Sequence, residues 1–244
     1  MRKMKSNDLP IQYILFFIIL LGAFMNAQTK DGICHVKRTG DFKITGKGDS
    51  ESWQKADWLK LSPRGESSDL LTQVKALYSD SGMYFLFDNA DRKVTATIQK
   101  DFEDLWNEDV VEVFLWPDED FPIYFEYELS PLNHELVLLV PNLKDQFLGW
   151  QPWHYEGERL TKHEIWIDGT AEKSDTKNIH WRAEFFIPYE LLHPLGNVPP
   201  QSGTHWRGNF YRCDYDLGHF ESWAWQPVEK RFHEYKKFGT LVFE

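Results

Sequence analysis

Short runs in which apolar and polar residues alternate recur along most of this chain, and they constrain its fold more than any other feature. Successive side chains of a β-strand point to opposite faces, so a period of two predicts strands with a buried face. Turn residues bound such runs at 70–77, 83–87, 110–116, 123–129, 136–140, 164–170, 180–187, 207–213, 222–225 and 239–243. Only residues 101–106 and 188–192 are expected to be helical.

These strands follow one another without the long helical connections that parallel strands need, and no linker rich in Pro, Gly or Ser interrupts them. The sequence therefore predicts one all-β domain over residues 28–244, an antiparallel β-sandwich of the immunoglobulin-like or jelly-roll type. In the hairpin loop at 79–82, Gly82 is expected to supply a positive φ.

The first residues have the pattern of a secretory signal peptide. Arg2, Lys3 and Lys5 precede an apolar stretch at 11–24, and Ala27 offers a small residue for cleavage. The apolar stretch is shorter than the roughly 20 residues that span a bilayer. We expect residues 1–27 to be removed and the remaining chain to be periplasmic or extracellular, without membrane association. Retention of the segment as an N-terminal anchor is the alternative.

Cys34 and Cys213 are the two cysteines of the chain. Two cysteines cannot form a disulfide framework or a four-cysteine zinc site. Export would permit a disulfide between them. Arg212 and Asp214 flank Cys213, so its side chain points away from theirs, to the inside. A bridge and two buried thiols both remain open at this stage.

Charge excludes one class of partner. The chain has 38 acidic and 27 basic residues, which gives a net charge of -11. Nucleic-acid binding requires a basic face that neutralises phosphates, so this class is not expected. The negative charge also favours neutral saccharides over anionic polymers. The sequence contains no nucleophile elbow, zinc-protease motif, phosphate-binding loop or dinucleotide fingerprint.

Aromatic residues are the unusual part of the composition, with 11 Trp, 10 Tyr and 18 Phe, or 16% of the chain. Not all of the Trp residues are expected to be core. Sugar rings stack an apolar face on Trp, while their hydroxyls need polar partners. Within 207–213, Asn209 and Tyr211 share one strand face, whereas Phe210 and Arg212 share the other. The candidate carbohydrate-binding residues are Trp106, Glu112, Asn209, Arg212, Trp223, Trp225 and Gln226.

At these residues the sequence resembles the family 9 carbohydrate-binding modules and the wider group of family 9-like proteins. The motifs that carry the resemblance occur in the family's order along nearly the whole chain. They are Ile44-Thr45-Gly46-Lys47, Trp53-Gln54-Lys55-Ala56, residues 78–84, 109–114 and 124–133, Asp168-Gly169-Thr170, Trp181-Arg182-Ala183-Glu184 with Ile187-Pro188 and Leu191, residues 206–212, and Phe232-His233 with Phe238-Gly239.

The resemblance implies a sandwich of the type shared with haem-binding cytochrome domains, and a site for the end of a saccharide chain. Members of the family clamp a terminal sugar between two Trp rings and bind its hydroxyls through Glu, Arg, Asn and Gln. Trp106 corresponds to the first Trp and Glu112 to its hydrogen-bonding Glu, while Trp223 or Trp225, near Gln226, is the candidate second Trp. The resemblance also implies structural calcium ions. We expect a monomer that binds a saccharide without cleaving it.

Three other functions remain open. Glu112, Glu126 and Glu128 could serve as paired carboxylates of a glycoside hydrolase or lyase. A haem protein of the same sandwich type would need Met or His axial ligands, but Met83 is the one Met beyond the leader, within a strand, so no haem is expected. A scaffold that binds a protein partner without sugar affinity would require the Trp residues to be buried.

Overall fold

The computed structural model describes residues 32–65, 68–144, 146–168 and 179–244. Its strands are β1 (Ile33–Arg38), β2 (Leu59–Lys60), β3 (Ser62–Pro63), β4 (Thr72–Tyr78), β5 (Gly82–Asp91), β6 (Val110–Trp116), β7 (Ile123–Leu129), β8 (Glu135–Leu143), β9 (Gln146–Phe147), β10 (Gln151–Pro152), β11 (Lys162–Asp168), β12 (Ile179–Pro188), β13 (His205–Asp214), β14 (Glu221–Ala224) and β15 (Gly239–Phe243). Helical segments are single turns: η1 (Glu51–Lys55), η2 (Leu105–Asn107), η3 (Gly157–Arg159), α1 (Tyr189–Leu192), η4 (Asp216–Gly218) and η5 (Tyr235–Lys237).

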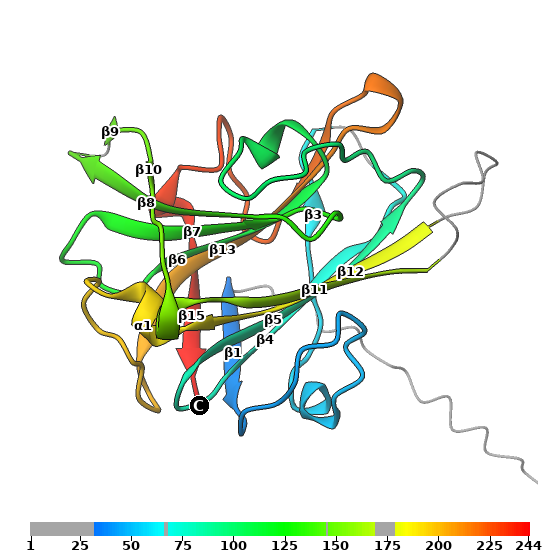
Figure 1. Ribbon diagram of the computed structural model, residues 1–244. Helices are drawn as coiled ribbons and strands as arrows, with labels where there is room; N and C mark the ends of the chain where they lie inside the picture. Colours follow the sequence, from blue (N-terminus) through cyan, green and yellow to red (C-terminus); the bar gives the residue numbers. More distant parts are fainter. Residues whose placement is uncertain (1–31, 66–67, 145, 169–178) are drawn as a thin grey trace, which may run out of the picture.

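The strands form two layers that one strand connects. The first layer runs in the order β10-β8-β7-β6-β13-β15, and the second runs β4-β5-β12-β11. Strand β1 joins them, because its first four residues pair with β15 and its last two residues pair with β4, in both cases parallel. Figure 1 shows the first layer above the second. The predicted antiparallel β-sandwich is confirmed.

Alternation along the strands separates two apolar clusters. Val111, Val113 and Leu115 of β6 point between the layers, where they share a core with Phe85 of β5. Phe114, between them in sequence, points to the other side of the first layer and belongs to a second cluster. The second cluster is covered by loops instead of by a sheet, so the outer face of the first layer is also largely buried. The candidate site lies on that outer face.

Most predicted elements match the observed ones, but two local expectations are wrong. Residues 101–106 hold only the start of the single turn η2, so the predicted helix there is wrong. Gly82 does not have a positive φ. A glycine is needed there for space, because a Cβ at Gly82 would lie 2.3 Å from the carbonyl oxygen of Ile187 on β12.

Cys34 and Cys213 are both buried free thiols. Of the two alternatives that the sequence left open, this structure therefore has two thiols and not a disulfide bridge. Cys34 belongs to the core between the layers, whereas Cys213 belongs to the outer cluster. Met83 is fully buried in the core between the layers.

The predicted signal peptide, residues 1–27, lies outside the described residues. In the part of the chain that the structure describes, no helix has the length and apolar character to span a bilayer.

Candidate functional site

A pocket of about 270 Å³ lies on the outer face of the first layer, and we call it the carboxyl pocket. Strands β6, β7, β8 and β13 form its floor, while η2 and four loops form its walls. Its lining comprises Arg64, Trp106, Glu112, Phe114, Glu126, Glu128, Leu138, Trp150, Cys213, Tyr215, Phe220, Arg231, Phe232 and His233.

Three glutamates on neighbouring strands occupy the floor. Glu112 of β6 and Glu128 of β7 are directly opposed in the strand register, and Glu126 lies two residues before Glu128 on the same face. All three are buried, with exposed fractions of 2%, 1% and 3% for Glu112, Glu128 and Glu126. Oε2 of Glu126 and both carboxyl oxygens of Glu128 have no hydrogen-bond partner among the described residues. The floor therefore presents acceptors aimed at whatever enters the pocket.

Burial favours the neutral form of these carboxyl groups. It raises the pKa of Glu112 from 4.5 to about 8. Burial and the neighbouring Glu112 raise the pKa values of Glu126 and Glu128 well above the ordinary range. A carboxyl that is protonated can donate as well as accept a hydrogen bond. The Cys213 thiol adds a weak donor to Oε1 of Glu112, at 3.6 Å.

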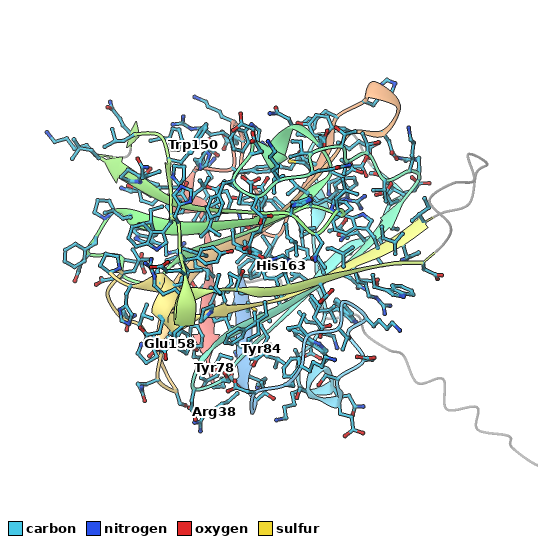
Figure 2. All side chains as sticks on the ribbon, viewed as in Figure 1. Arg38, Tyr78, Tyr84, Trp150, Glu158 and His163 are labelled. Carbon is cyan, nitrogen blue, oxygen red and sulfur yellow. The ribbon has the colours of Figure 1, made fainter. Side chains whose placement is uncertain are left out.

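Two Trp residues border the pocket. The rings of Trp106 and Trp150 meet edge to face, with centroids 5.0 Å apart and an interplanar angle of 68°. Trp150 is 44% exposed, and Trp106 is half-buried. Figure 2 labels Trp150 near β8 and β10, on the side of the first layer away from the second layer. The two rings form an aromatic rim above the carboxyl floor.

His233 lies between the rim and the floor. Its ring stacks on Phe147 at 4.3 Å between centroids, and its Nδ1 shares a hydrogen bond of 2.6 Å with the hydroxyl of Tyr124. Burial, together with the charge of Arg231, lowers the pKa of His233 to about 4. The imidazole is therefore neutral at pH 7, and its Nδ1 is held by Tyr124.

Arg64 and Arg231 supply the positive charges of the lining. The Arg64 guanidinium lies 4.9 Å from the centre of the Phe232 ring, and that of Arg231 lies 5.0 Å from the Phe147 ring. Neither forms an ion pair with any carboxylate of the described residues. Both are thus able to donate to a ligand.

The structure brings two of the sequence candidates together and separates the others. Trp106 and Glu112 line the same pocket, while their role in binding stays a prediction. Asn209 is fully buried, and its side chain binds the Tyr211 hydroxyl and both backbone polar groups of Gln226. The side chain of Gln226 lies beside Gly32. Neither Asn209 nor Gln226 lines the pocket.

Three expectations need correction. Trp223 and Trp225 are 0% and 6% exposed and belong to the core between the layers, so neither is the second stacking ring. The guanidinium of Arg212 stacks on Trp223 at 4.8 Å in the interior. Its Nη2 donates to Oδ2 of Asp91 at 3.0 Å and to Oδ2 of Asp214 at 2.5 Å, all three side chains being fully buried. Arg212 is therefore a structural residue.

Trp150 was missed among the sequence candidates. Phe147, Gly149 and Trp150 lie in a stretch without a period of two, outside every predicted strand. Large aromatic residues in a loop have no sheet face to bury them, and such residues are typical of a binding surface. This pattern is the sequence feature that indicates Trp150. The sequence indicates Glu126 and Glu128 only as candidate catalytic groups. Two acidic residues two positions apart are also typical of an exposed strand face, so the pattern does not indicate that they line a pocket.

A second group of acidic residues lies between the layers. Carboxyl oxygens of Asp91, Asp214 and Asp216 lie within 4.8 Å of one another. Arg212 pairs with Asp91 and Asp214, whereas both carboxyl oxygens of Asp216 are buried and have no hydrogen-bond partner in the part of the chain that the structure describes. Ca²⁺ takes carboxylate oxygens as ligands. A cation bound here would satisfy the buried oxygens of Asp216, which would otherwise remain without a hydrogen-bond partner.

Comparison with solved structures finds the same fold in proteins of low sequence identity. One is described as a candidate carbohydrate-binding protein from Bacteroides uniformis, with 17% identity, a TM-score of 0.68, and 87% of this chain and 99% of that chain covered. Two are a family 9 carbohydrate-binding module from Caldicellulosiruptor kristjanssonii. Its complex with cellotriose has 16% identity and a TM-score of 0.59, with 87% of this chain and 93% of that chain covered. Its complex with glucose has 15% identity and a TM-score of 0.60, with 87% of this chain and 95% of that chain covered.

A search of curated proteins finds no match. The family model described as "Carbohydrate-binding family 9" matches residues 53–243, which includes every strand from β2 to β15. This span also contains the carboxyl pocket and every motif that carries the resemblance except Ile44-Thr45-Gly46-Lys47, which precedes it. The chain belongs to carbohydrate-binding family 9.

Proposed function

We propose that this protein binds the end of a neutral oligo- or polysaccharide in the carboxyl pocket and does not cleave it. The observation that carries the proposal is the combination of an aromatic rim, Trp106 and Trp150, with unpartnered carboxyl oxygens of Glu126 and Glu128 below it. A sugar ring needs both, an apolar platform for one face and hydrogen-bonding groups for its hydroxyls. Family membership supports the same conclusion.

The shape of the site supports recognition of a chain end. Residues of β6, β7, β8 and β13 line the bottom of the pocket, so a saccharide would enter from the rim instead of passing through the site. A terminal sugar would place its ring against Trp106 or Trp150 and its hydroxyls toward the glutamates. Arg64 and Arg231 would donate from the walls. The bound cellotriose and glucose of the Caldicellulosiruptor module are ligands of this class.

The experiment is a binding screen by isothermal titration calorimetry with soluble β-glucan, xylan and mannan oligosaccharides, and with a uronic-acid oligosaccharide as the anionic comparison. We expect binding to at least one neutral series and weaker binding of the uronate at low salt, because the chain carries a net charge of -11. Absence of binding to every saccharide would contradict the proposal. Preference for the uronate would contradict its neutral-ligand part.

The three glutamates also raise the possibility of glycoside hydrolysis, which needs one protonated and one ionised carboxyl group. Here burial raises all three pKa values, so no glutamate of the pocket is favoured as the ionised partner. Binding without cleavage is the better account. Release of reducing ends from any polysaccharide of the screen would favour glycoside hydrolysis over binding without cleavage.

We also propose that a calcium ion binds at Asp91, Asp214 and Asp216. The unpartnered oxygens of Asp216 support this site. The ion would supply positive charge between two layers of the sandwich, next to Arg212. Its role would be structural, because none of these residues lines the carboxyl pocket.

Export of the chain is a further part of the proposal. The basic residues, apolar stretch and small residue within 1–27 support a cleaved signal peptide. N-terminal sequencing of the protein recovered from the periplasm or the medium tests this. A protein retained in the membrane fraction with its leader would support an anchor instead.

A further inference from the structure

A second cavity adjoins the carboxyl pocket, and we call it the outer groove. It has a volume of about 600 Å³ and is lined by Ser62, Pro63, Arg64, Gly65, Phe220, Ser222, Ala224, Pro227, Val228, Glu229 and Lys230. Two of these residues, Arg64 and Phe220, also line the carboxyl pocket. The two cavities therefore meet along a shared wall.

Arg64 is held in this wall from both sides. The antiparallel pairing of β3 with β14 fixes the backbone before it, and its own N–H donates to the carbonyl of Ser222 at 2.7 Å. Its Nη1 donates to the Ser222 hydroxyl at 3.4 Å, and its guanidinium lies over Phe232. The Nε is buried and has no hydrogen-bond partner within residues 32–65, 68–144, 146–168 and 179–244. The side chain is thus positioned in advance, with a donor still unused.

Phe220 forms the other part of the wall. It is 54% exposed, although it contacts the Tyr215 ring with centroids 4.9 Å apart. Tyr215 itself lines the carboxyl pocket, and its hydroxyl donates to the carbonyl of Trp106 at 2.8 Å. An exposed aromatic ring therefore continues the aromatic rim toward the outer groove.

The outer groove has the mixed lining that a sugar chain requires. Ser62, Ser222 and Lys230 offer polar groups, while Pro63 and Pro227 offer apolar surface. Among the described residues, Lys230 has no ion-pair partner within 4.0 Å. Hydroxyl and ammonium groups beside apolar patches suit linked neutral sugars, which alternate polar edges with apolar faces.

We infer that the carboxyl pocket and the outer groove form one extended site for a linear oligosaccharide longer than a disaccharide. The terminal sugar occupies the pocket, and the following sugars pass Phe220 and Arg64 into the groove. This inference rests on the proposed function and specifies its ligand by chain length. It makes Phe220 and Arg64 residues that determine length preference.

The first test is a length series measured by isothermal titration calorimetry on the full folded chain without its leader. The probes are glucose, cellobiose, cellotriose and cellotetraose, and the corresponding xylo-oligosaccharides. Affinity is expected to rise about tenfold from the disaccharide to the tetrasaccharide of the series that binds, as one or two added stacking contacts would give. Equal affinity for all lengths overturns the extended site and leaves the proposed function standing. Absence of binding to both series, and to the mannan oligosaccharides of the screen, overturns both.

The second test removes the shared aromatic wall. Phe220→Ala is expected to lower the ratio of tetrasaccharide to monosaccharide affinity about fivefold, the equivalent of one lost stacking contact. Phe121→Ala is the matched control, because Phe121 is 60% exposed and lines neither cavity. Thermal melts of both variants verify folding. An unchanged ratio in Phe220→Ala, with the melting temperature retained, overturns the inference.

Discussion

Glu112 and Glu128 lie directly opposite each other on strands β6 and β7, and both carboxyl groups are buried on the same side of the sheet. Two ionised carboxylates in this position would repel each other without water to screen them. Burial raises the pKa of both groups, and the neighbouring Glu112 raises that of Glu128 further, so the site is connected to the stability of the fold.

Stability is expected to fall as pH rises from about 4.5 to about 8, the interval between the unfolded and folded pKa values of Glu112. The unfolded chain loses this proton earlier than the folded chain, so ionisation favours unfolding throughout the interval. Glu112→Gln removes the titrating group and is expected to flatten the dependence. The measurement is a series of urea titrations from pH 5 to pH 9. Identical pH dependence in the variant and the wild type would refute this linkage.

Trp106→Ala and Trp150→Ala are each expected to lower saccharide affinity about tenfold, because each removes one ring of the stacking surface. The melting temperature should change little for Trp150, whose ring is 44% exposed. Calorimetric titration with the best ligand of the screen, beside a thermal melt, separates the two effects. Destabilised variants with unaltered affinity would show that the rings serve packing only.

Trp223→Ala is expected to have the opposite profile. The Trp223 ring is fully buried, and the Arg212 guanidinium packs on it at 4.8 Å. Its removal from the core should lower the free energy of unfolding by about 3–5 kcal/mol. Chemical denaturation measures this loss, and saccharide affinity of the remaining folded protein should be unchanged. A mild effect on stability with a loss of binding would restore Trp223 to the site.

Calcium is expected to raise the melting temperature of the wild-type protein, and chelation by EGTA should lower it. A ligand at a concentration 100-fold above its Kd stabilises the folded state by about 2.7 kcal/mol. Asp216→Asn keeps the shape of the side chain and removes its charge, so the response to calcium should disappear. Magnesium serves as the comparison ion. No calcium response in the wild type would argue against this site.

Cys34 and Cys213 should both react with a thiol reagent once the protein is unfolded without reductant, because the structure has both as free, buried thiols. In the native state both should react slowly, since burial raises the pKa of Cys34 to about 12 and that of Cys213 well above its usual value. Quantification of released chromophore counts the thiols. No reactive thiol in the unfolded, unreduced protein would mean that the cysteines are bridged.

The sequence by itself determined the strands and the faces of the strands. The bounds of β6 and β7 follow from alternation and from the turn residues between them, and both match the expected ranges. Alternation also places Phe210 with Arg212, and Asn209 with Tyr211, on opposite faces of β13. These properties are local, because the geometry of a strand sets them within a few residues. The succession of strands without helices likewise sufficed for the fold class.

Only the tertiary structure decided which strand face would be covered, and by what. The sequence suggested Trp106 as one stacking ring and Trp223 or Trp225 as the other, yet β14 pairs with β13 so that Trp223 points between the layers. Glu126 and Glu128 resemble an exposed strand face, but Arg231 and His233, about 100 residues later, cover them. Burial depends on contacts between segments far apart in the chain, and a period of two carries no information about those contacts.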